Sequence, residues 1–144
     1  MLRCFGAETA DMRHEACCSL SMVARRVEEL VVWQLGHELR KKVYAITATG
    51  TAVGDFRFSN QIRDAASSVT RNVAEGFGRY KHREFAQFLV IARGSLFEIE
   101  DHLRDGLVRG YWDREAAKDI HDLCNRTIAA VTYFIRYLKS SEAP

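Results

Sequence analysis

Apolar residues recur every three or four positions along four stretches of the chain, which is the spacing that places them on one face of an α-helix. The first stretch predicts a helix over about 27–47, with its apolar stripe at Val32, Leu35, Leu39, Val43 and Ile46. Small residues and two glycines over 47–55 then predict the longest internal loop. The alternation typical of half-buried strands is missing from the sequence, so the pattern predicts helices alone.

The second stretch predicts a helix that begins near Ser59 and ends around Phe77. Ser59 is the predicted N-cap, because its hydroxyl can accept a hydrogen bond from an amide without a partner in the first turn. Gly76 and Gly78 are the predicted stop, since glycines do not sustain a helix cheaply. The apolar positions between these ends are Ile62, Ala66, Val69 and Val73.

Two longer helices complete the pattern. The third is predicted over about 82–108, with Gly110 as a left-handed stop, and Gly94 within it suggests close packing of a neighbour. Asp113 is the predicted N-cap of the fourth helix. The apolar positions of that helix are Ala117, Ile120, Cys124, Ile128, Val131, Phe134 and Leu138.

Four helices joined by mostly short turns are expected to pack as antiparallel neighbours. The predicted fold class is therefore all-α, an antiparallel up-and-down four-helix bundle over residues 27–140. The first 26 residues show little periodicity and are expected to form a flexible N-terminal extension, and residues 141–144 a C-terminal tail. The chain has 144 residues and a single proline, at position 144, so no helix has to break at a proline.

Composition excludes several classes of protein. No stretch approaches the roughly 18 apolar residues that a membrane span needs, so we expect a cytoplasmic protein without a membrane partner. The Glu-x-x-His spacing of bundle metal sites is absent, and the acidic residues near His102 read as a solvated face. We expect no metal, no cofactor and no enzymatic activity. The four cysteines are interpreted as reduced thiols rather than as a disulfide or zinc site: Cys4, Cys17, Cys18 and Cys124.

Charge is more informative in its distribution than in its sum, which is only +2. The segment 57–93 is basic and the segment 98–122 is acidic, so the molecule is expected to be electrically polarised. Basic side chains near an aromatic residue can contact phosphates and a base. The candidate nucleic-acid-binding residues are Arg63, Arg71, Arg79, Lys81 and Arg83, extended by Arg40, Lys41 and Lys42 of the first helix. Alternatively, the basic half pairs with the acidic half, within the chain or between copies.

Two further groups of residues have structural interpretations. Polar residues one turn apart on the second and third helices, Asn72, Glu75, Ser95 and Glu98, are predicted to form a buried polar network that fixes helix register. Large apolar residues favour a different function from nucleic-acid binding, namely a scaffold that binds protein or assembles with itself. Those residues are Trp33, Phe97 and Trp112.

The runs SSVTRNVAEGFGR over 67–79, EFAQFL over 84–89 and ARGSLFE over 92–98 resemble the 23S ribosomal RNA intervening-sequence protein family. The runs LVVWQL over 30–35 and HEL over 37–39 are similar to the opening helix of that family. Thr70 stands where the family usually has proline, and Lys81 where it usually has a capping serine. Lysine cannot cap the third helix, although it adds positive charge at the proposed surface.

The resemblance implies a four-helix bundle that assembles as a ring-shaped homopentamer and carries no enzymatic activity. It also implies a distant similarity to the accessory variability determinant of diversity-generating retroelements, which is thought to bind nucleic acid and a reverse transcriptase. We therefore predict a non-enzymatic oligomeric accessory protein that binds RNA or DNA through the basic surface around the second and third helices. The alternative is a protein-binding or self-assembly scaffold without a nucleic-acid role.

Overall fold

The computed structural model describes residues 24–79 and 81–140. This part contains four long α-helices and two short 3-10 helices, and no strand: η1 (Val27–Glu29), α2 (Val31–Thr47), η2 (Gly50–Gly54), α3 (Phe56–Phe77), α4 (His82–Val108) and α5 (Arg114–Ser140). The all-α prediction is confirmed. The extension and the tail that the sequence predicts lie outside the described residues over 1–23 and 141–144.

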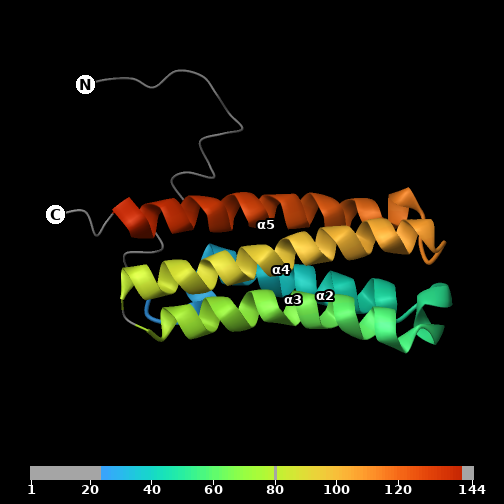
Figure 1. The fold of residues 1–144 in the computed structure, drawn as a ribbon, viewed down its shortest axis with the longest axis horizontal. Helices are drawn as coiled ribbons and strands as arrows, with labels where there is room; N and C mark the ends of the chain where they lie inside the picture. Colours follow the sequence, from blue (N-terminus) through green and yellow to red (C-terminus); the bar gives the residue numbers. More distant parts are fainter. Residues whose placement is uncertain (1–23, 80, 141–144) are drawn as a thin grey trace, which may run out of the picture.

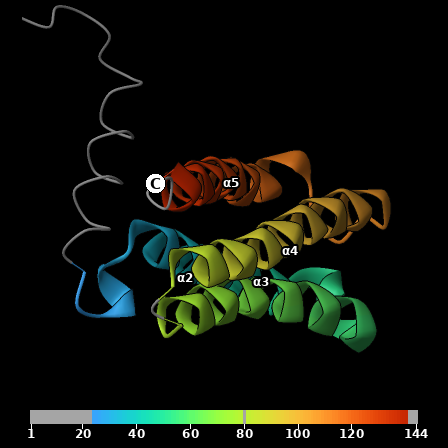
Figure 2. The same ribbon diagram turned by 60° about the vertical axis from the view of Figure 1, so that its left-hand side comes forward.

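The four long helices pack as an up-and-down bundle. Each helix lies beside its neighbours in the chain, and α5 closes the arrangement by packing on α2 (Figure 1). Figure 2 shows α4 between α3 and α5, with α2 on the other side of the bundle. None of the described helices is long and apolar enough to cross a membrane.

The predicted apolar stripes form one core between the helices. Each helix contributes at least one side chain with no exposed surface, namely Leu39, Ile62, Leu96 and Val131. Fully burying a side chain of this size contributes roughly 1.5–3 kcal/mol. The stripes therefore supply the main favourable energy of the bundle, and they explain why the periodic pattern was sufficient to predict it.

Two predicted helix starts are wrong by about one turn. The first long helix begins at Val31, because Leu30 is extended (φ −75°, ψ 126°) and the preceding residues form the separate helix η1. The N-cap of α3 is Asp55 rather than Ser59: its side chain accepts a hydrogen bond from the Phe58 amide at 3.0 Å. Ser59 lies inside α3 and donates its hydroxyl to the Ala52 carbonyl at 2.9 Å, which ties η2 to the helix.

The other helix ends agree with the prediction. Gly110 has a φ of +71°, so it is the left-handed residue after α4. The Asp113 carboxylate accepts a hydrogen bond from the Ala116 amide at 2.8 Å and caps α5. The helix α4 begins at His82 although Lys81, in the N-cap position, makes no side-chain capping bond.

Gly94 does not pack closely on another helix within the described chain. A Cβ at this position would have no atom of the described chain within 4 Å. The close approach occurs at Gly106, where a Cβ would lie 2.0 Å from Cζ2 of Trp112. Trp112 is only 8% exposed and donates its indole N–H to the Leu103 carbonyl at 3.1 Å. The small residue in α4 therefore makes room for a tryptophan from the α4–α5 turn.

Candidate nucleic-acid interface

Two of the predicted basic residues lie along the contact between α2 and α3, about two helical turns apart. The Arg40 guanidinium donates to the Thr70 hydroxyl at 3.4 Å and lies 3.1 Å from Nδ1 of His37. The Arg63 guanidinium donates to the Thr47 hydroxyl at 2.8 Å. All of these partners are uncharged oxygens or an imidazole. The contacts therefore fix the direction of both arginines without neutralising them.

Aromatic rings accompany these arginines along α2. The guanidinium carbon of Arg63 lies 5.3 Å from the centroid of the Tyr44 ring, and Tyr44 is 45% exposed. The rings of Trp33 and His37 stack with centroids 4.8 Å apart and planes 8° from parallel. Positions 33, 37, 40 and 44 step by three or four, so they share one side of α2. The sequence analysis did not single out Tyr44 or His37, although this spacing could have identified them.

Arg71 extends this region on α3. It is exposed and lies one turn after Ser67, whose hydroxyl is 3.4 Å from the Tyr44 hydroxyl. Within residues 24–79 and 81–140, Arg40, Arg63 and Arg71 make no ion pair with a carboxylate. We call this region the α2–α3 surface and define it by Trp33, His37, Arg40, Tyr44, Arg63 and Arg71. It carries uncompensated positive charge beside ring faces.

The two lysines that follow Arg40 do not join it on this surface. Consecutive residues on an α-helix point about 100° apart, so three in a row cannot face the same way. The Lys41 ammonium lies 2.5 Å from the Glu38 carboxylate. Its hydrogen bond to this carboxylate, together with its positive charge, lowers the pKa of Glu38. Lys42 is half-buried. Of this run, Arg40 is the residue whose side chain hydrogen-bonds α3, through the Thr70 hydroxyl.

Arg79 lies at the end of α3, remote from Arg63 along that helix. Its guanidinium hydrogen-bonds the Glu75 carboxylate and lies 5.3 Å from the centroid of the Phe88 ring. Exposed ion pairs of this kind contribute about 0–1 kcal/mol. A phosphate could therefore compete for Arg79, but part of its charge is already compensated.

The other basic residues of the α3–α4 turn are exposed. The Lys81 ammonium lies 3.5 Å from the Glu84 carboxylate, and Arg83 is on the first turn of α4. Tyr80, the aromatic residue of this turn, is outside the described residues. The turn is thus a second basic region, separate from the α2–α3 surface, and its charge is partly balanced by neighbouring glutamates.

Two of the four residues predicted for the polar network, Asn72 and Ser95, are connected in the structure. They are joined through Ser68, which was not among the four. The Ser95 hydroxyl donates to the Ser68 hydroxyl at 2.8 Å, and the Asn72 amide donates to the same hydroxyl at 3.0 Å. Glu75 and Glu98 are exposed instead. Ser68 and Asn72 are one turn apart, a spacing that could have indicated the pair. The network joins α3 to α4.

An exposed apolar face occupies the outside of α4. Val90 is 42% exposed, Ile91 53% and Phe97 53%. With Gly94, where an added Cβ would meet no atom of the described residues within 4 Å, these residues form a region that we call the α4 outer face. Three large residues were predicted to serve a scaffold, and of these Phe97 lies on the α4 outer face. Trp112 is buried in the α4–α5 turn, and Trp33 is half-buried on α2. Exposed apolar clusters of this kind mark interaction surfaces.

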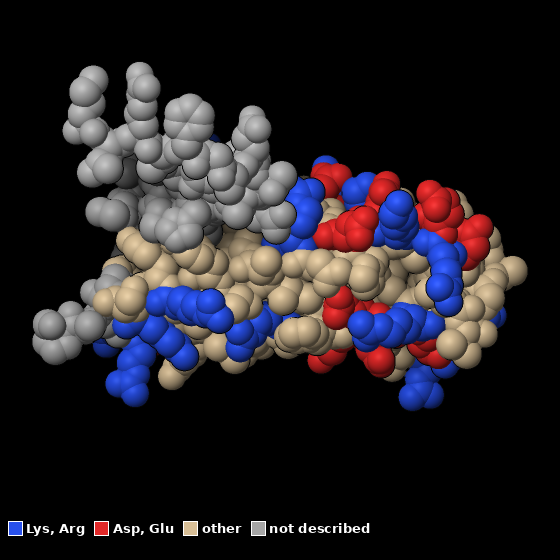
Figure 3. Space-filling view, turned by 90° about the horizontal axis from the view of Figure 1, so that it is seen from above, with Lys and Arg blue, Asp and Glu red and all other residues tan. Residues whose placement is uncertain are grey.

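Charge on the molecular surface is unevenly distributed. Figure 3 shows acidic side chains gathered toward the end of the bundle that holds the α4–α5 turn. At the other end, the charged side chains in view on this face are Lys and Arg. The antiparallel arrangement produces this separation, because the acidic end of α4 lies beside the acidic start of α5. The distribution agrees with the polarity that the sequence predicts.

A cluster at that end of the bundle was missed by the sequence analysis. Asp55 accepts a hydrogen bond from the Tyr111 hydroxyl at 2.6 Å and lies 3.5 Å from the Arg109 guanidinium. We call these three residues the clasp. The hydrogen bond from Tyr111 lowers the pKa of Asp55, and the same bond raises the pKa of Tyr111. The clasp joins the start of α3 to the α4–α5 turn.

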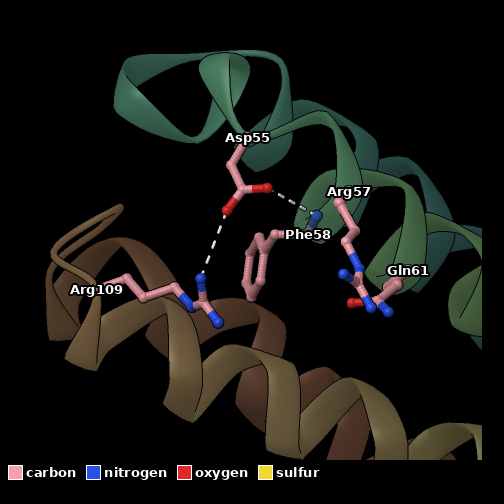
Figure 4. Close-up of a pocket in the computed structure, with 5 residues that line it drawn as sticks. All are labelled: Asp55, Arg57, Phe58, Gln61 and Arg109. Atoms are coloured by element: carbon pink, nitrogen blue, oxygen red, sulfur yellow. Dashed lines mark hydrogen bonds and ion pairs between the residues drawn. The ribbon is translucent and has the colours of Figure 1, made fainter.

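Beside the clasp is a small open cavity of about 280 Å³ (Figure 4). Its lining adds Arg57, Phe58 and Gln61 to Asp55 and Arg109. The Arg109 guanidinium lies over the Phe58 ring at 5.4 Å and hydrogen-bonds Asp105 at 2.8 Å. With two carboxylates close to Arg109, the cavity lacks the net positive charge of the α2–α3 surface. We assign it a structural role.

The described residues offer little for metal or nucleophilic chemistry. No group of three or more His, Cys, Asp or Glu in this part of the chain could hold a metal ion. Glu100, predicted to be on a solvated face, is buried between α4 and α5. Cys124 is buried too, which raises the pKa of its thiol to about 12 and keeps it protonated. The other three cysteines lie outside the described residues.

Comparison with known proteins agrees with this architecture. No curated protein matches the chain. The crystal structure of a protein of unknown function from the S23 ribosomal protein family of Bacteroides thetaiotaomicron is similar, with a TM-score of 0.67. The similarity covers 74% of this chain and 99% of that one at 21% identity, so it shows a shared fold alone. The model of the 23S rRNA-intervening sequence protein family matches residues 28–132. Since that match includes most of the bundle, the chain belongs to the 23S rRNA-intervening sequence protein family.

Proposed function

We propose that this protein is a non-enzymatic, cytoplasmic, oligomeric accessory protein that binds RNA through its α2–α3 surface. The observation that carries the proposal is the set of arginines on that surface, Arg40, Arg63 and Arg71, which make no ion pair in the described chain. Arginines without a carboxylate partner are well suited to phosphates, because a guanidinium can donate two parallel hydrogen bonds to one phosphate. Arg79 and Lys81 would add contacts once their glutamate partners are exchanged for phosphates, and Arg83 on the first turn of α4 would add another.

Self-association would strengthen this binding. We propose the α4 outer face as the contact between copies, since Val90, Ile91 and Phe97 are too exposed for a face without a partner. The resemblance described above implies a homopentameric ring. Repeating a weak basic surface in such a ring raises the overall affinity by about 10²- to 10⁴-fold without new contacts.

The proposal is tested by titrating labelled RNA and DNA with the protein at several salt concentrations, after light scattering has given the oligomeric mass. Binding should weaken steeply as salt increases, because each phosphate contact releases a counterion. The double variant Arg40→Gln/Arg63→Gln should reduce the slope of log K against log[salt] by about 1.4–1.8. Arg126→Gln is the matched control, because Arg126 is exposed on α5 and likewise makes no ion pair in the described chain. An assembled protein that binds no nucleic acid at low salt would refute the proposal.

The second candidate function is a protein-binding scaffold, favoured by the same α4 outer face. Phe97→Glu places a charge at its centre and should shift the light-scattering mass toward the monomer if the face joins copies of this chain. If the mass stays constant and RNA does not bind, the face is available to another protein, and the scaffold becomes the better description. Salt separates the two functions, because apolar contacts tolerate it.

A further inference from the structure

Aromatic rings with exposed or half-buried surface lie on the α2–α3 surface. Tyr44 is 45% exposed, and the Arg63 guanidinium covers only one side of its ring. Trp33 is half-buried and its ring is parallel to that of His37. Each of these rings is held in place by a neighbour from the chain. A ring held this way loses little conformational entropy when a base stacks on it.

Charge and rings alternate along this surface. On α2, Arg40 lies between His37 and Tyr44, and Arg63 reaches Tyr44 from α3. Proteins that bind single-stranded nucleic acid combine a basic track for the backbone with aromatic side chains on which bases stack. A duplex cannot use the rings, because its bases are already stacked inside the helix. The rings would therefore contribute to binding only if the bases are unpaired.

We infer that the α2–α3 surface binds single-stranded nucleic acid, with bases stacked on Tyr44 and Trp33 and phosphates held by Arg40, Arg63 and Arg71. The inference rests on the proposed RNA binding and specifies the form of RNA. Trp33 and Tyr44 are eleven residues apart on α2, about 16 Å at 1.5 Å per residue. That length accommodates about five nucleotides at the ~3.4 Å rise of a stacked strand.

The test compares a labelled 12-nucleotide RNA without self-complementarity with a labelled 12-base-pair RNA duplex, by fluorescence anisotropy in the same buffer. The single strand should bind more tightly than the duplex. Tyr44→Leu, which removes the ring, should weaken single-strand binding by at least about 5-fold and duplex binding by a clearly smaller factor, since stacking on one side chain contributes at least about 5-fold. Tyr44→Phe is the matched control: it keeps the ring but loses the hydroxyl that lies near Ser67.

A second readout reports on Trp33 directly. Saturation with the single strand should quench part of the intrinsic tryptophan fluorescence, and this quenching should disappear in Trp33→Phe. The other tryptophan, Trp112, is 8% exposed and bonded to a main-chain carbonyl, so it should not respond. Far-ultraviolet circular dichroism of each variant checks that the bundle is intact.

The possible results separate this inference from the function on which it rests. Equal binding of single strand and duplex, unaffected by Tyr44→Leu, would overturn the inference and leave RNA binding in place. Equal losses in Tyr44→Leu and Tyr44→Phe would assign the effect to the hydroxyl and would overturn stacking. Failure of both RNAs to bind at low salt would overturn the proposed function together with the inference.

Discussion

Two glycines of α4 provide a matched pair of substitutions with opposite expected effects. At Gly106 an added methyl group would lie 2.0 Å from the Trp112 ring, far inside van der Waals contact. The ring cannot retreat easily, because it packs against Phe58 at 5.7 Å between centroids and donates to the Leu103 carbonyl. At Gly94 the same methyl group would meet nothing of the described chain within 4 Å. Both positions lie within the helix.

The magnitudes follow from these surroundings. Alanine is about 1 kcal/mol better than glycine in a helix interior, so Gly94→Ala should raise the free energy of unfolding by about that amount. At Gly106 the same gain is opposed by overpacking, about 1–3 kcal/mol, and by loss of the indole hydrogen bond, about 1–3 kcal/mol if the buried carbonyl is left without a donor. The net expectation for Gly106→Ala is a loss of about 1–5 kcal/mol.

Urea unfolding followed by fluorescence and circular dichroism measures both effects. With a slope of about 2 kcal/mol per molar urea, the two variants should differ in midpoint by about 1–3 M. All proteins must be compared at one protomer concentration, because self-association contributes to apparent stability. A Gly106→Ala variant as stable as the wild type would refute the placement of Trp112. If Gly94→Ala raises stability but weakens self-association, Gly94 lies in the contact between copies.

Three further predictions concern single side chains. Asp55→Asn should lower stability at pH 7. The pKa of Asp55 is lowered in the folded state, so its contribution is complete above the ordinary aspartate pKa, about 3.9, and is lost as pH falls through the folded value. The gap between wild type and variant in urea titrations should accordingly close under acid conditions. Cys124 should resist alkylation at pH 8 in the folded protein and react after unfolding, as mass spectrometry of the labelled peptide would show, because its thiol pKa is about 12. Ser68→Ala should cost about 1 kcal/mol in thermal unfolding, since it removes the hydroxyl that accepts hydrogen bonds from both Ser95 and Asn72, whereas Ser67→Ala should change stability by less than about 0.5 kcal/mol. Equal effects of the two serine substitutions would contradict the bridging role of the Ser68 hydroxyl.

The fold could be predicted because its main energy is encoded in a local pattern. Stripes such as the one through Leu39 and Val43 repeat over many turns, and a single misplaced residue does not change the period. Helix starts are less certain, since Asp55 and Ser59 are both good capping residues. The choice between them depends on the Ala52 carbonyl, which engages the Ser59 hydroxyl and becomes close only when η2 has formed.

The candidate site was harder to predict for a geometric reason. The helical spacing of positions 33, 37, 40 and 44 was readable from the sequence, but the contact of Arg63 with Tyr44 depends on how α3 is rotated and shifted against α2. Proximity in the sequence suggested a single basic patch that joins Arg63 to Arg79 and Lys81. In the structure, Arg79 and Lys81 lie in the α3–α4 turn, at the opposite end of α3 from Arg63. Their nearby glutamates, Glu75 and Glu84, were readable from helical spacing and balance part of that charge.

The clasp has a consequence for the order in which the bundle forms. Asp55 and Tyr111 are separated by 56 positions, whereas the contacts within each helical hairpin close much shorter loops. Long loops are costly to close before other contacts hold their ends together. The clasp is therefore expected to form after the rate-limiting step of folding. Substitutions in it should mainly accelerate unfolding and leave the folding rate nearly unchanged, so that the clasp sets how long the folded bundle lasts rather than how fast it is made.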